Sequence, residues 1–435
     1  MKACIVGAGC SGITVAKRLK ESGIDYDQFD LSDDVGGNWY HANPNGLSAC
    51  YQSLHIDTSK YRLAFEDYPV PEDWPDFPHH SQLAQYFRDY VDHFGLRERI
   101  TFNTGVELAE RCADQTWNVQ LSSGEQRSYD ALIVANGHHW CPNIPNEYET
   151  ATPFTGIQIH SHSYDSPFQP QDMRHKRILV VGVGNSAMDI ASELSQRYLA
   201  SKLFVSTRHG VWVLPKYING KPADKILTPS WIPDRIALSL ARLAIKKLVG
   251  RMSSYGLPEP DHEPLSAHVS VSSEFLTRVG SGDVHIKPGI DCIEGDTVSF
   301  KDGSREPIDV IIWATGYRIS FPFLKHPELQ PDTHNSFPLY RRMIKPGWRN
   351  LFFVGLAQPL PTLVNFAEQQ SKYIVAVLRG QHRLPDTADM EQQIVKDEKR
   401  YLGSYYPSPR HTMQVDFVKY VQDIKKDLQR SGSWQ

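Results

Sequence analysis

The chain has 435 residues, which is more than one compact domain usually holds and suits two or three domains, each with its own core. Its hydrophobic content of 40% and charged content of 22% are typical of a globular protein and exclude a disordered or fibrous one. The formal net charge of -4 provides no basic face for nucleic acid, so DNA and RNA binding are not expected.

The six cysteines are scattered, without a C-x-x-C pair or a zinc-like spacing, which is typical of free thiols in a reducing compartment. Met1 leads straight into the apolar run Ala3 to Val6, without the basic and longer apolar stretches of a secretory signal. The sequence has no run of about 18 uncharged apolar residues, so no membrane span is expected. These features together predict a cytoplasmic protein.

Strand-like apolar runs alternate with longer helical patterns from the first residues onward, which indicates an α/β protein built from βαβ units. A strand, a glycine turn and a helix occur at residues 2–22 and again at 177–196, so two nucleotide-binding units are predicted. Between them we expect a helix capped near Ser81 and running through Phe94, a strand over 116–121 and a buried parallel strand over 130–135.

The first glycine turn, Gly7 to Gly12 (GAGCSG), stands directly after a strand and directly before a helix. Glycines permit the tight turn and let backbone N–H groups approach a pyrophosphate, whose charge the helix N-terminus favours. Asp30 ends the next strand, where a carboxylate accepts hydrogen bonds from ribose hydroxyls. The predicted dinucleotide site here comprises Gly7, Gly9, Ser11, Gly12 and Asp30.

The second glycine turn, Gly182 to Ala187 (GVGNSA), follows an apolar strand and opens a helix through Leu194. The next strand ends in an arginine, Arg208, where an NAD site would place an acid. A guanidinium can hold a 2′-phosphate bidentately and a carboxylate would repel it, so NADPH is favoured over NADH. The predicted NADPH site comprises Gly182, Gly184, Asn185, Ser186, Ser206, Thr207 and Arg208.

A basic amphipathic helix is predicted around Arg235 to Arg251. It is expected to pack on its own domain or on a subunit partner, and attachment to a membrane surface is the weaker alternative. The sequence leaves the subunit number open, with a homodimer as the candidate. Lys216 and Lys221, which precede this helix, are further candidates for the 2′-phosphate, although solvated surface lysines are the more common explanation for either one.

The stretch from Phe154 to Tyr164 (FTGIQIHSHSY) resembles the F-x-G-x-x-x-H-x-x-x-Y fingerprint of the flavin-containing monooxygenases and lies between the two glycine turns, as that family requires. The sister Baeyer-Villiger group normally ends the same spacing in Trp, so Tyr164 favours the former. Three further stretches look like elements of the family, 36–39 (GGNW), 314–317 (ATGY) and 353–359 (FVGLAQP). Their order and spacing extend the resemblance over most of the chain.

The resemblance implies two Rossmann-like dinucleotide-binding domains, with an NADPH domain at 168–304 inserted in a discontinuous FAD domain. The FAD domain would comprise 1–167 and 305–435, the latter with the C-terminal helices. The resemblance also adds FAD contacts, at Gly37, Asn38, Trp39, Thr315, Gly316 and Gln358. In the implied reaction NADPH reduces FAD, O2 adds to give a C4a-(hydro)peroxyflavin, and a sulfur or nitrogen of a small organic substrate takes one oxygen atom.

Two candidate catalytic residues follow from the same resemblance. Asp57 stands where the family commonly has an Asn whose amide is thought to contact the oxygenated flavin, and an ionised Asp only accepts hydrogen bonds, so its role stays open. His160 is the fingerprint histidine, for which an orienting hydrogen-bond partner is the more common role than a catalyst. His55, His138 and His139 form no metal-ligand spacing, so no metal site is expected.

Three alternative functions remain. The nearest is Baeyer-Villiger oxidation, in which the same peroxide attacks ketones to give esters or lactones. A flavin-dependent disulfide reductase shares two nucleotide turns but needs a redox-active cysteine pair, and Cys4 and Cys10 lack that spacing. A non-catalytic nucleotide sensor would show no oxygen uptake with NADPH.

Overall fold

The computed structural model describes residues 1–145, 147–148, 152–196, 199–225, 234–267, 270–359, 362–402, 405 and 412–430. The chain divides into two compact units. Unit 1 comprises Met1–Ser48, Thr58–Cys141 and Arg318–Gln435, and unit 2 comprises Ala49–Asp57 and Pro142–Tyr317. The short piece Ala49–Asp57 therefore belongs to unit 2, although unit 1 supplies the chain on both sides of it.

Unit 1 is built on a five-stranded parallel sheet with the order β20-β7-β1-β2-β3. Its strands are β1 (Lys2–Val6), β2 (Asp25–Phe29), β3 (Ile100–Thr101), β7 (Ala131–Val134) and β20 (Leu351–Phe353). Every residue of β7 is buried, as expected of a parallel strand covered on both faces. The buried strand predicted over 130–135 is thus confirmed as β7.

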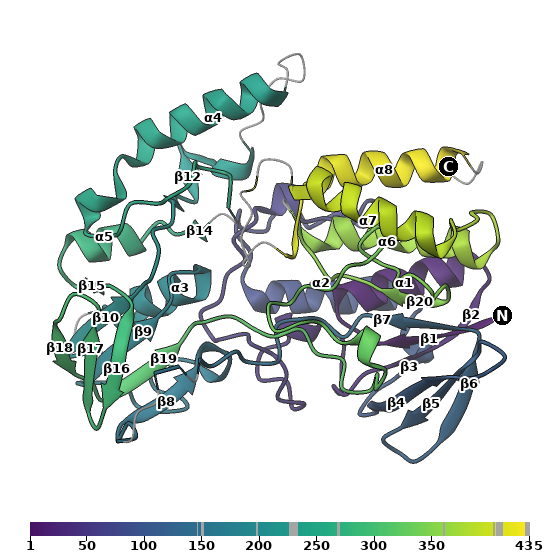
Figure 1. The fold of residues 1–435 in the computed structure, drawn as a ribbon, viewed down its shortest axis with the longest axis horizontal. Coiled ribbons are helices and arrows are strands. Elements are labelled where there is room, and N and C mark those ends of the chain that lie inside the picture. The colour runs from purple at the N-terminus through teal and green to yellow at the C-terminus, as the bar shows by residue number, and fades with distance from the viewer. Residues whose placement is uncertain are drawn as a thin grey trace. The chain divides into compact units, whose positions relative to one another are not determined.

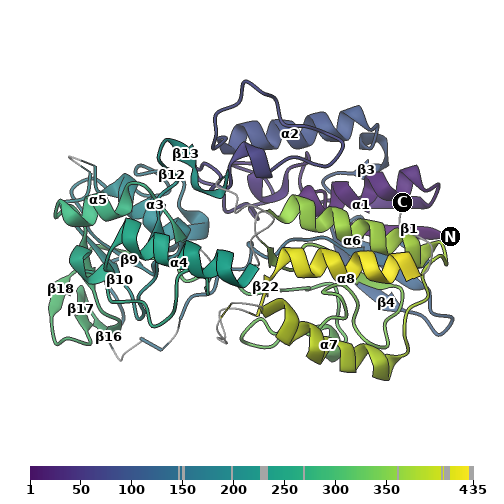
Figure 2. The same ribbon diagram turned by 90° about the horizontal axis from the view of Figure 1, so that it is seen from above.

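Helices cover one face of this sheet and a small antiparallel sheet covers the other (Figure 1). The helices are α1 (Cys10–Glu21), α2 (His80–His93), α6 (Leu363–Leu378), α7 (Thr387–Leu402) and α8 (Phe417–Arg430), of which α1, α6, α8 and α7 run side by side (Figure 2). The antiparallel sheet has the order β4-β5-β6, formed by Val106–Arg111, Trp117–Leu121 and Gln126–Tyr129. Trp117 and Leu121 of β5 share one core with Val6 and Val134 of the parallel sheet. A short parallel pair, β21 (Gln358–Pro359) with β22 (Gln414–Val415), completes the unit.

Helix α2 begins one residue before the predicted cap, Ser81. Its N-cap is His79, whose Nδ1 accepts a hydrogen bond from the backbone N–H of Ser81 at 3.3 Å. The Gln82 side chain accepts in turn from the backbone N–H of His79 at 3.0 Å. This reciprocal capping box satisfies two N–H groups that the helix itself leaves without an acceptor. The helix ends at His93 with Phe94 as its C-cap, so the predicted helix is confirmed with a corrected start.

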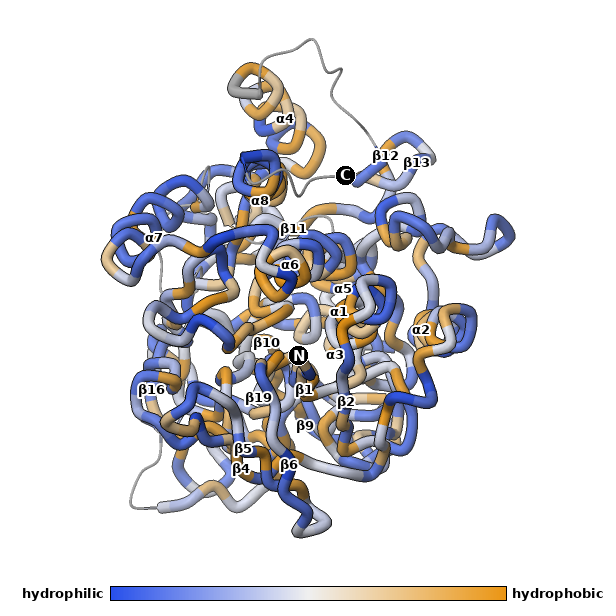
Figure 3. Tube along the Cα trace, turned by 90° about the vertical axis from the view of Figure 1, so that its right-hand side faces the viewer, coloured by the Kyte–Doolittle hydropathy of each residue, from blue (hydrophilic) through white to orange (hydrophobic). Residues whose placement is uncertain are grey.

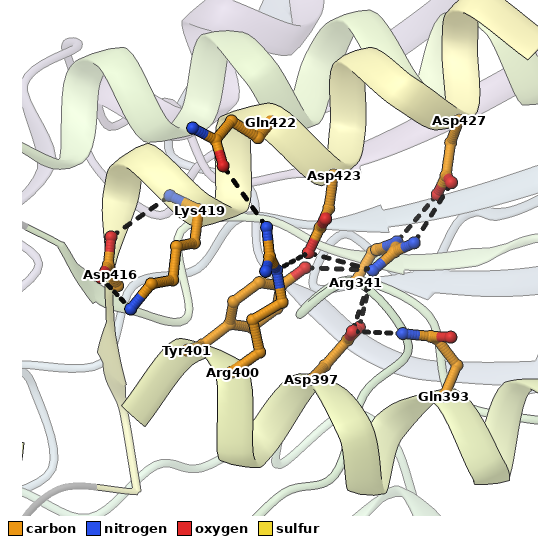
Figure 4. A network of polar contacts seen from close by, with 10 residues as sticks. All are labelled: Arg341, Gln393, Asp397, Arg400, Tyr401, Asp416, Lys419, Gln422, Asp423 and Asp427. Carbon is orange, nitrogen blue, oxygen red and sulfur yellow. Dashed lines mark hydrogen bonds and ion pairs between the residues drawn. The ribbon is translucent and has the colours of Figure 1, made fainter. Parts of the chain in front are cut away.

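The buried guanidinium of Arg341 forms ion pairs with both α7 and α8, the last two helices of unit 1 (Figure 4). Arg341 is 7% exposed and pairs with Asp397 of α7 at 2.9 Å, with Asp427 of α8 at 2.8 Å and with Asp423 of α8 at 3.7 Å. The Tyr420 hydroxyl donates to the backbone carbonyl of Arg341 at 3.0 Å. Removing one partner of a buried ion pair costs about 3–5 kcal/mol, so this cluster holds α7 and α8 against the segment that leads into β20.

Unit 2 repeats the same plan with a parallel sheet of order β15-β10-β9-β19-β8. Its strands are β8 (Ile157–His160), β9 (Arg177–Val181), β10 (Lys202–Ser206), β15 (His285–Lys287) and β19 (Val310–Trp313). Successive residues of β9 serve different cores, since Val180 packs with α3 (Asn185–Leu194) and α5 (Phe275–Gly280), and Val181 packs with β16 (Ile290–Glu294) and β17 (Thr297–Phe300). The remaining strands are β18 (Arg305–Pro307), β11 (Val213–Leu214), β14 (Ser270–Val271), β12 (Tyr217–Ile218) and β13 (Lys221–Pro222).

Helix α4 (Asp234–Val249) confirms the predicted amphipathic helix. Ile245 and Val249 pack against the core of unit 2, and Lys246 pairs with Glu263 at 2.7 Å. The helix also carries four apolar side chains that are at least half exposed, at Ile236, Leu240, Leu243 and Leu248. In Figure 3 apolar residues, coloured orange, recur along the trace of α4. Of the helices in the part of the chain that the structure describes, none is long and apolar enough to cross a membrane.

In both units the glycine turn follows the central strand of a parallel sheet, β1 in unit 1 and β9 in unit 2. Each turn leads into a helix, α1 or α3, and then into the neighbouring strand, β2 or β10. This is the topology of a dinucleotide-binding βαβ unit. The predicted fold class, α/β with two Rossmann-like domains of which one interrupts the other in the chain, is confirmed.

Candidate functional site

The three glycines of the first turn differ in what surrounds them. Gly7 has a φ of +107°, and a Cβ there would lie 2.5 Å from the carbonyl oxygen of Ala135, the residue after β7. A Cβ on Gly12 would lie 2.0 Å from the carbonyl oxygen of Gly7. A Cβ on Gly9 would meet only Gly37, at 3.6 Å from its Cα. Close backbone packing therefore requires Gly7 and Gly12, whereas Gly9 keeps the entrance to α1 uncovered.

The helix entrances behind both turns lack a side-chain cap. The N-cap residues of α1 and α3 are Gly9 and Gly184, which have no side chain and make no side-chain cap hydrogen bond. By contrast, His79 caps α2 and Thr362 caps α6. The first N–H groups of α1 and α3 therefore retain capacity for an outside acceptor. Together with the helix dipole, this makes both entrances fit a pyrophosphate.

Asp30 lies against the first turn. One carboxylate oxygen accepts a hydrogen bond from the backbone N–H of Ala8, and the other accepts from the backbone N–H of Ser32 at 2.7 Å. Burial raises the pKa of Asp30, while these two N–H donors act in the opposite direction. A carboxylate has lone pairs beyond those two bonds, so Asp30 fits the predicted ribose acid.

The other predicted FAD residues of unit 1 gather near the same turn only in part. A Cβ on Gly37, which has a φ of +54°, would lie 3.0 Å from the Cα of Gly9. Asn38 and Trp39 follow in the short 3-10 helix that begins at Gly37. Gln358 lies in β21, where its side-chain oxygen accepts from the Gln414 amide at 2.7 Å.

One glycine that the motifs did not single out approaches the first helix. Gly355, after β20, has a φ of +80°, and a Cβ there would lie 2.3 Å from Oγ of Ser11 in α1. The stretch 353–359 was recognised as a family element, but the close approach to Ser11 joins parts of the chain far apart in sequence. Sequence spacing alone could not have revealed it.

Thr315 and Gly316, also predicted to contact FAD, belong to unit 2. The Thr315 hydroxyl donates to the backbone carbonyl of Asn143 at 2.6 Å, and Gly316 has a φ of +82°. These two residues and the first glycine turn therefore belong to different units. Their contact with FAD stays a prediction.

The second turn repeats the first at its leading glycine. Gly182 has a φ of +120°, and a Cβ there would lie 2.5 Å from the carbonyl oxygen of Ala314, the residue after β19. A Cβ on Gly184 would meet nothing within 4 Å. Asn185 and Ser186 open α3, and the Asn185 side-chain oxygen accepts from the backbone N–H of Val271 at 3.1 Å. The backbone of the turn is therefore closely packed at Gly182, whereas the space beside Gly184 is unoccupied by described residues.

The three residues predicted to favour a 2′-phosphate differ in what they offer. The Ser206 hydroxyl donates to the Pro288 carbonyl, and the Thr207 hydroxyl donates to the His209 carbonyl, both at 2.7 Å. The Arg208 side chain is 55% exposed and pairs with Glu147 at 3.4 Å. Arg208 is thus the accessible donor of the three, because both hydroxyl protons already have acceptors.

Asp57 lies at the end of the piece Ala49–Asp57 in unit 2 and pairs with Lys216, with 3.2 Å between Oδ1 and Nζ. Both side chains are largely buried, at 24% and 20% exposure. Burial raises the pKa of Asp57, and the Lys216 ammonium counteracts that rise. Lys216 thus faces a carboxylate, whereas Lys221, the other lysine considered for the phosphate, is exposed in β13.

His160 ends β8 and is 4% exposed. Its Nδ1 accepts a hydrogen bond from the backbone N–H of His162 at 3.0 Å, and its ring meets that of Tyr317 edge-on at 5.1 Å. Burial lowers the pKa of His160 to about 4, so the ring is neutral at physiological pH. A neutral, buried ring with one nitrogen committed to the backbone suits an orienting role, as proposed for it from the sequence.

The whole chain matches known proteins of one family. A family model described as flavin-binding monooxygenase-like matches residues 1–431. Flavin-containing monooxygenase 5 of Rattus norvegicus is 33% identical over 445 residues, which cover 97% of this chain and 81% of that protein. Dimethylaniline monooxygenase [N-oxide-forming] 2 of Macaca mulatta is 32% identical over 98% of this chain and 82% of its own length. In fold, the chain resembles an open crystal structure of cyclohexanone monooxygenase, with a TM-score of 0.74 and 18% identity over 99% of this chain and 98% of that one.

Proposed function

Because the chain belongs to the family of flavin-binding monooxygenases, we propose that it transfers one oxygen atom from O2 to sulfur or nitrogen of small organic substrates. Membership confirms the predicted family, the predicted enzyme class and the predicted cofactors, FAD and NADPH. The observation that carries the proposal is the pair of uncapped helix N-termini, each behind a glycine turn on the central strand of a parallel sheet.

The first turn is proposed to bind FAD. The N–H groups at the entrance of α1 would hold the pyrophosphate, with Gly7, Gly9, Ser11 and Gly12 shaping the approach, and Asp30 would accept hydrogen bonds from the ribose hydroxyls. Bound FAD, once reduced by NADPH, supplies the activation of molecular oxygen. Further contacts with the flavin nucleotide are proposed for Gly37, Asn38, Trp39, Thr315, Gly316 and Gln358.

The second turn is proposed to bind NADPH. The entrance of α3, with Gly182, Gly184, Asn185 and Ser186, would hold the pyrophosphate. Arg208 would pair with the 2′-phosphate, which requires the guanidinium to leave Glu147. Ser206 and Thr207 would then shape this pocket through the backbone bonds that their hydroxyls make.

His160 and Asp57 are proposed to act on the site without a proton-transfer step. His160 would orient the fingerprint segment through its bond with the backbone of His162. Asp57 would present a carboxylate to the site. Transfer of oxygen to a soft nucleophile needs few acid-base groups, so the main demand on the chain is to position both nucleotides and exclude water.

Sulfur or nitrogen is proposed over ketones as the acceptor of oxygen. The fingerprint ends in Tyr164 rather than Trp, and a relative that is 32% identical carries an N-oxide-forming activity in its name. Baeyer-Villiger oxidation is the alternative, to which the likeness to cyclohexanone monooxygenase adds the shared fold alone.

The experiment uses the purified protein with NADPH, air and either a methyl aryl sulfide or a cyclic ketone. Sulfoxide formed in step with NADPH consumption is the expected result. Lactone from the ketone at a higher kcat/KM than sulfoxide would replace the proposal by its alternative. A colourless protein that gains no flavin on incubation with FAD would refute both.

The finer organisation of the protein is also proposed. We place the FAD domain at 1–167 and 305–435 and the NADPH domain at 168–304, and the recurrence of the strand, glycine turn and helix at 177–194 supports the insertion. The compact units divide the chain at other residues, since β8 and β19 belong to the sheet of unit 2. A reducing, cytoplasmic location is supported by the six cysteines, all of which are free thiols. A homodimer is supported by the exposed apolar side chains of α4, and light scattering of the wild type beside Leu243→Lys tests it.

A further inference from the structure

Unit 2 contains a polar cluster around Asp57 whose internal contacts the proposed function does not use. It is formed by the piece Ala49–Asp57, by the segment after β8, by α3 and by the segment before β12. Its members are Tyr51, Asp57, Tyr164, Asp189, Glu193 and Lys216. We refer to these six residues as the acidic cluster, since they include three carboxylates and one ammonium, which acts on Asp57 and Asp189.

Two of the three carboxylates are bonded to tyrosines. The Tyr51 hydroxyl donates to Asp189 at 2.7 Å, and the Tyr164 hydroxyl donates to Glu193 at 2.7 Å. The two rings pack edge-on with centroids 6.2 Å apart. Asp189 and Glu193 are four residues apart on α3 and so share one face of that helix. A neutral hydroxyl stabilises a carboxylate less than a cation does, so Asp189 and Glu193 have no full counter-charge in these bonds.

Asp57 differs from them because its partner is a cation. Lys216 lies 3.2 Å away, and the Asp57 charge acts in turn on Asp189 and Tyr51. Burial and the Asp57 charge together raise the pKa of Asp189 to about 6, and Lys216 opposes that rise. Lys216 is therefore the cation that favours the ionised forms of both Asp57 and Asp189.

We infer that Lys216 is the positioning residue for Asp57, holding its carboxylate ionised and fixed as a hydrogen-bond acceptor in the active site. The inference rests on the proposed function only in placing Asp57 at that site. It assigns to this chain an ion pair at a position where relatives commonly carry a neutral amide. It also explains why an acid is tolerated there, because an ionised carboxylate without a counter-charge is costly away from water.

The first test measures the thermal unfolding midpoint of the purified protein, as isolated, from pH 5 to pH 8 for the wild type, Lys216→Met, Lys216→Arg, Asp57→Asn and the Asp57→Asn/Lys216→Met double variant. A folded pKa above the unfolded value costs stability as pH rises through it. Loss of Lys216 removes a counter-charge that typically lowers a carboxyl pKa by about 1–3 units. The midpoint difference between wild type and Lys216→Met should therefore grow toward pH 8.

The double variant and the arginine variant make this test specific. In the Asp57→Asn background, Lys216→Met should retain only the smaller pH dependence that comes from Asp189, on which Lys216 also acts, and Lys216→Arg should behave like the wild type. If the effect of Lys216→Met is independent of pH, or if it persists unchanged in the Asp57→Asn background, the inference is wrong.

The second test follows the fraction of NADPH consumption that yields sulfoxide in the FAD-loaded enzyme as a function of pH. The midpoint of its acidic limb should move up by about 1–3 pH units in Lys216→Met and stay in place in Lys216→Arg. The limb should be absent in Asp57→Asn. A Lys216→Met profile that overlays the wild type would overturn the inference even if product formation is normal.

The two tests separate failure of the inference from failure of the proposed function. If the wild type forms no oxygenated product at all, the proposed function fails, and the unfolding series still decides whether Lys216 controls the charge of Asp57. If product forms but both series show no link between Asp57 and Lys216, only the inference fails.

Discussion

The two glycine turns share the close packing of their leading glycine and differ at their last position. In both, a Cβ on the leading glycine would lie 2.5 Å from the backbone carbonyl oxygen of the residue after the adjacent parallel strand. That residue is Ala135 for Gly7 and Ala314 for Gly182. At the sixth position unit 1 has Gly12 and unit 2 has Ala187, which is 1% exposed. The leading glycine is therefore a requirement of the shared topology, whereas the last one depends on how closely the helix approaches its own turn.

The two units differ again at the end of the second strand, where each is proposed to contact the sugar of its nucleotide. Asp30 accepts two backbone N–H groups, whereas Arg208 projects a guanidinium that is more than half exposed. A buried acceptor and an exposed cation suit different groups, ribose hydroxyls in one case and a phosphate in the other. We therefore propose that cofactor choice is set at the strand ends and that the turns themselves supply a common pyrophosphate site.

The largest expected effect on cofactor binding comes from replacing Gly12 of the first turn by alanine, the residue that the second turn has at the same position. In Gly12→Ala the new Cβ would lie 2.0 Å from the carbonyl oxygen of Gly7, so the helix or the turn must shift. Overpacking of this kind costs about 3 kcal/mol, which corresponds to an FAD affinity about 100-fold weaker. Flavin absorbance of the protein after gel filtration measures the loss.

The reverse exchange is the matched control. Ala187→Gly adds no atoms and costs only the helix propensity of alanine, about 1 kcal/mol. NADP+ affinity should stay within about threefold of the wild type, by fluorescence titration. If Gly12→Ala retains FAD as the wild type does, close packing is not the reason for glycine at this position.

The sequence predicted those parts of the site that local geometry decides. Gly7 and Gly182 could be identified because a positive φ after a strand is a property of a few consecutive residues. The strands β7, β9 and β10 were equally accessible, since parallel strands buried on both faces read as continuous apolar runs.

What the sequence did not reveal depends on contacts between distant residues. The cap of α2 is His79 because its ring reaches the helix N-terminus, although Ser81 is the more usual capping type. The pairing of Asp57 with Lys216 joins positions far apart in the chain and required the piece Ala49–Asp57 to belong to unit 2. The hydroxyls of Ser206 and Thr207 were assigned to a phosphate from proximity in sequence alone, and the structure gives them backbone acceptors.

An intermediate effect is expected from the acid of the first site. Asp30→Ala removes an ionised acceptor for the ribose and leaves the N–H of Ala8 without its partner, which together cost about 2 kcal/mol, or about 30-fold in FAD affinity. Asp30→Asn keeps one acceptor oxygen and should lose less than tenfold. Equal losses in the two variants would show that the charge of Asp30, and not its shape, holds the ribose.

The smallest effect is expected at Arg208, the cation of the second site. This effect concerns the preference for NADPH over NADH. Arg208→Ala removes the exposed guanidinium, and since water competes with its bond to a phosphate, we expect the ratio of kcat/KM for NADPH over NADH to fall by only about tenfold. The fall should come from KM for NADPH, with NADH barely affected. Thr207→Val is the matched control, because its hydroxyl already donates to the His209 carbonyl, and its ratio should stay within about twofold. A larger fall in Thr207→Val than in Arg208→Ala would transfer 2′-phosphate recognition from the guanidinium to the hydroxyl.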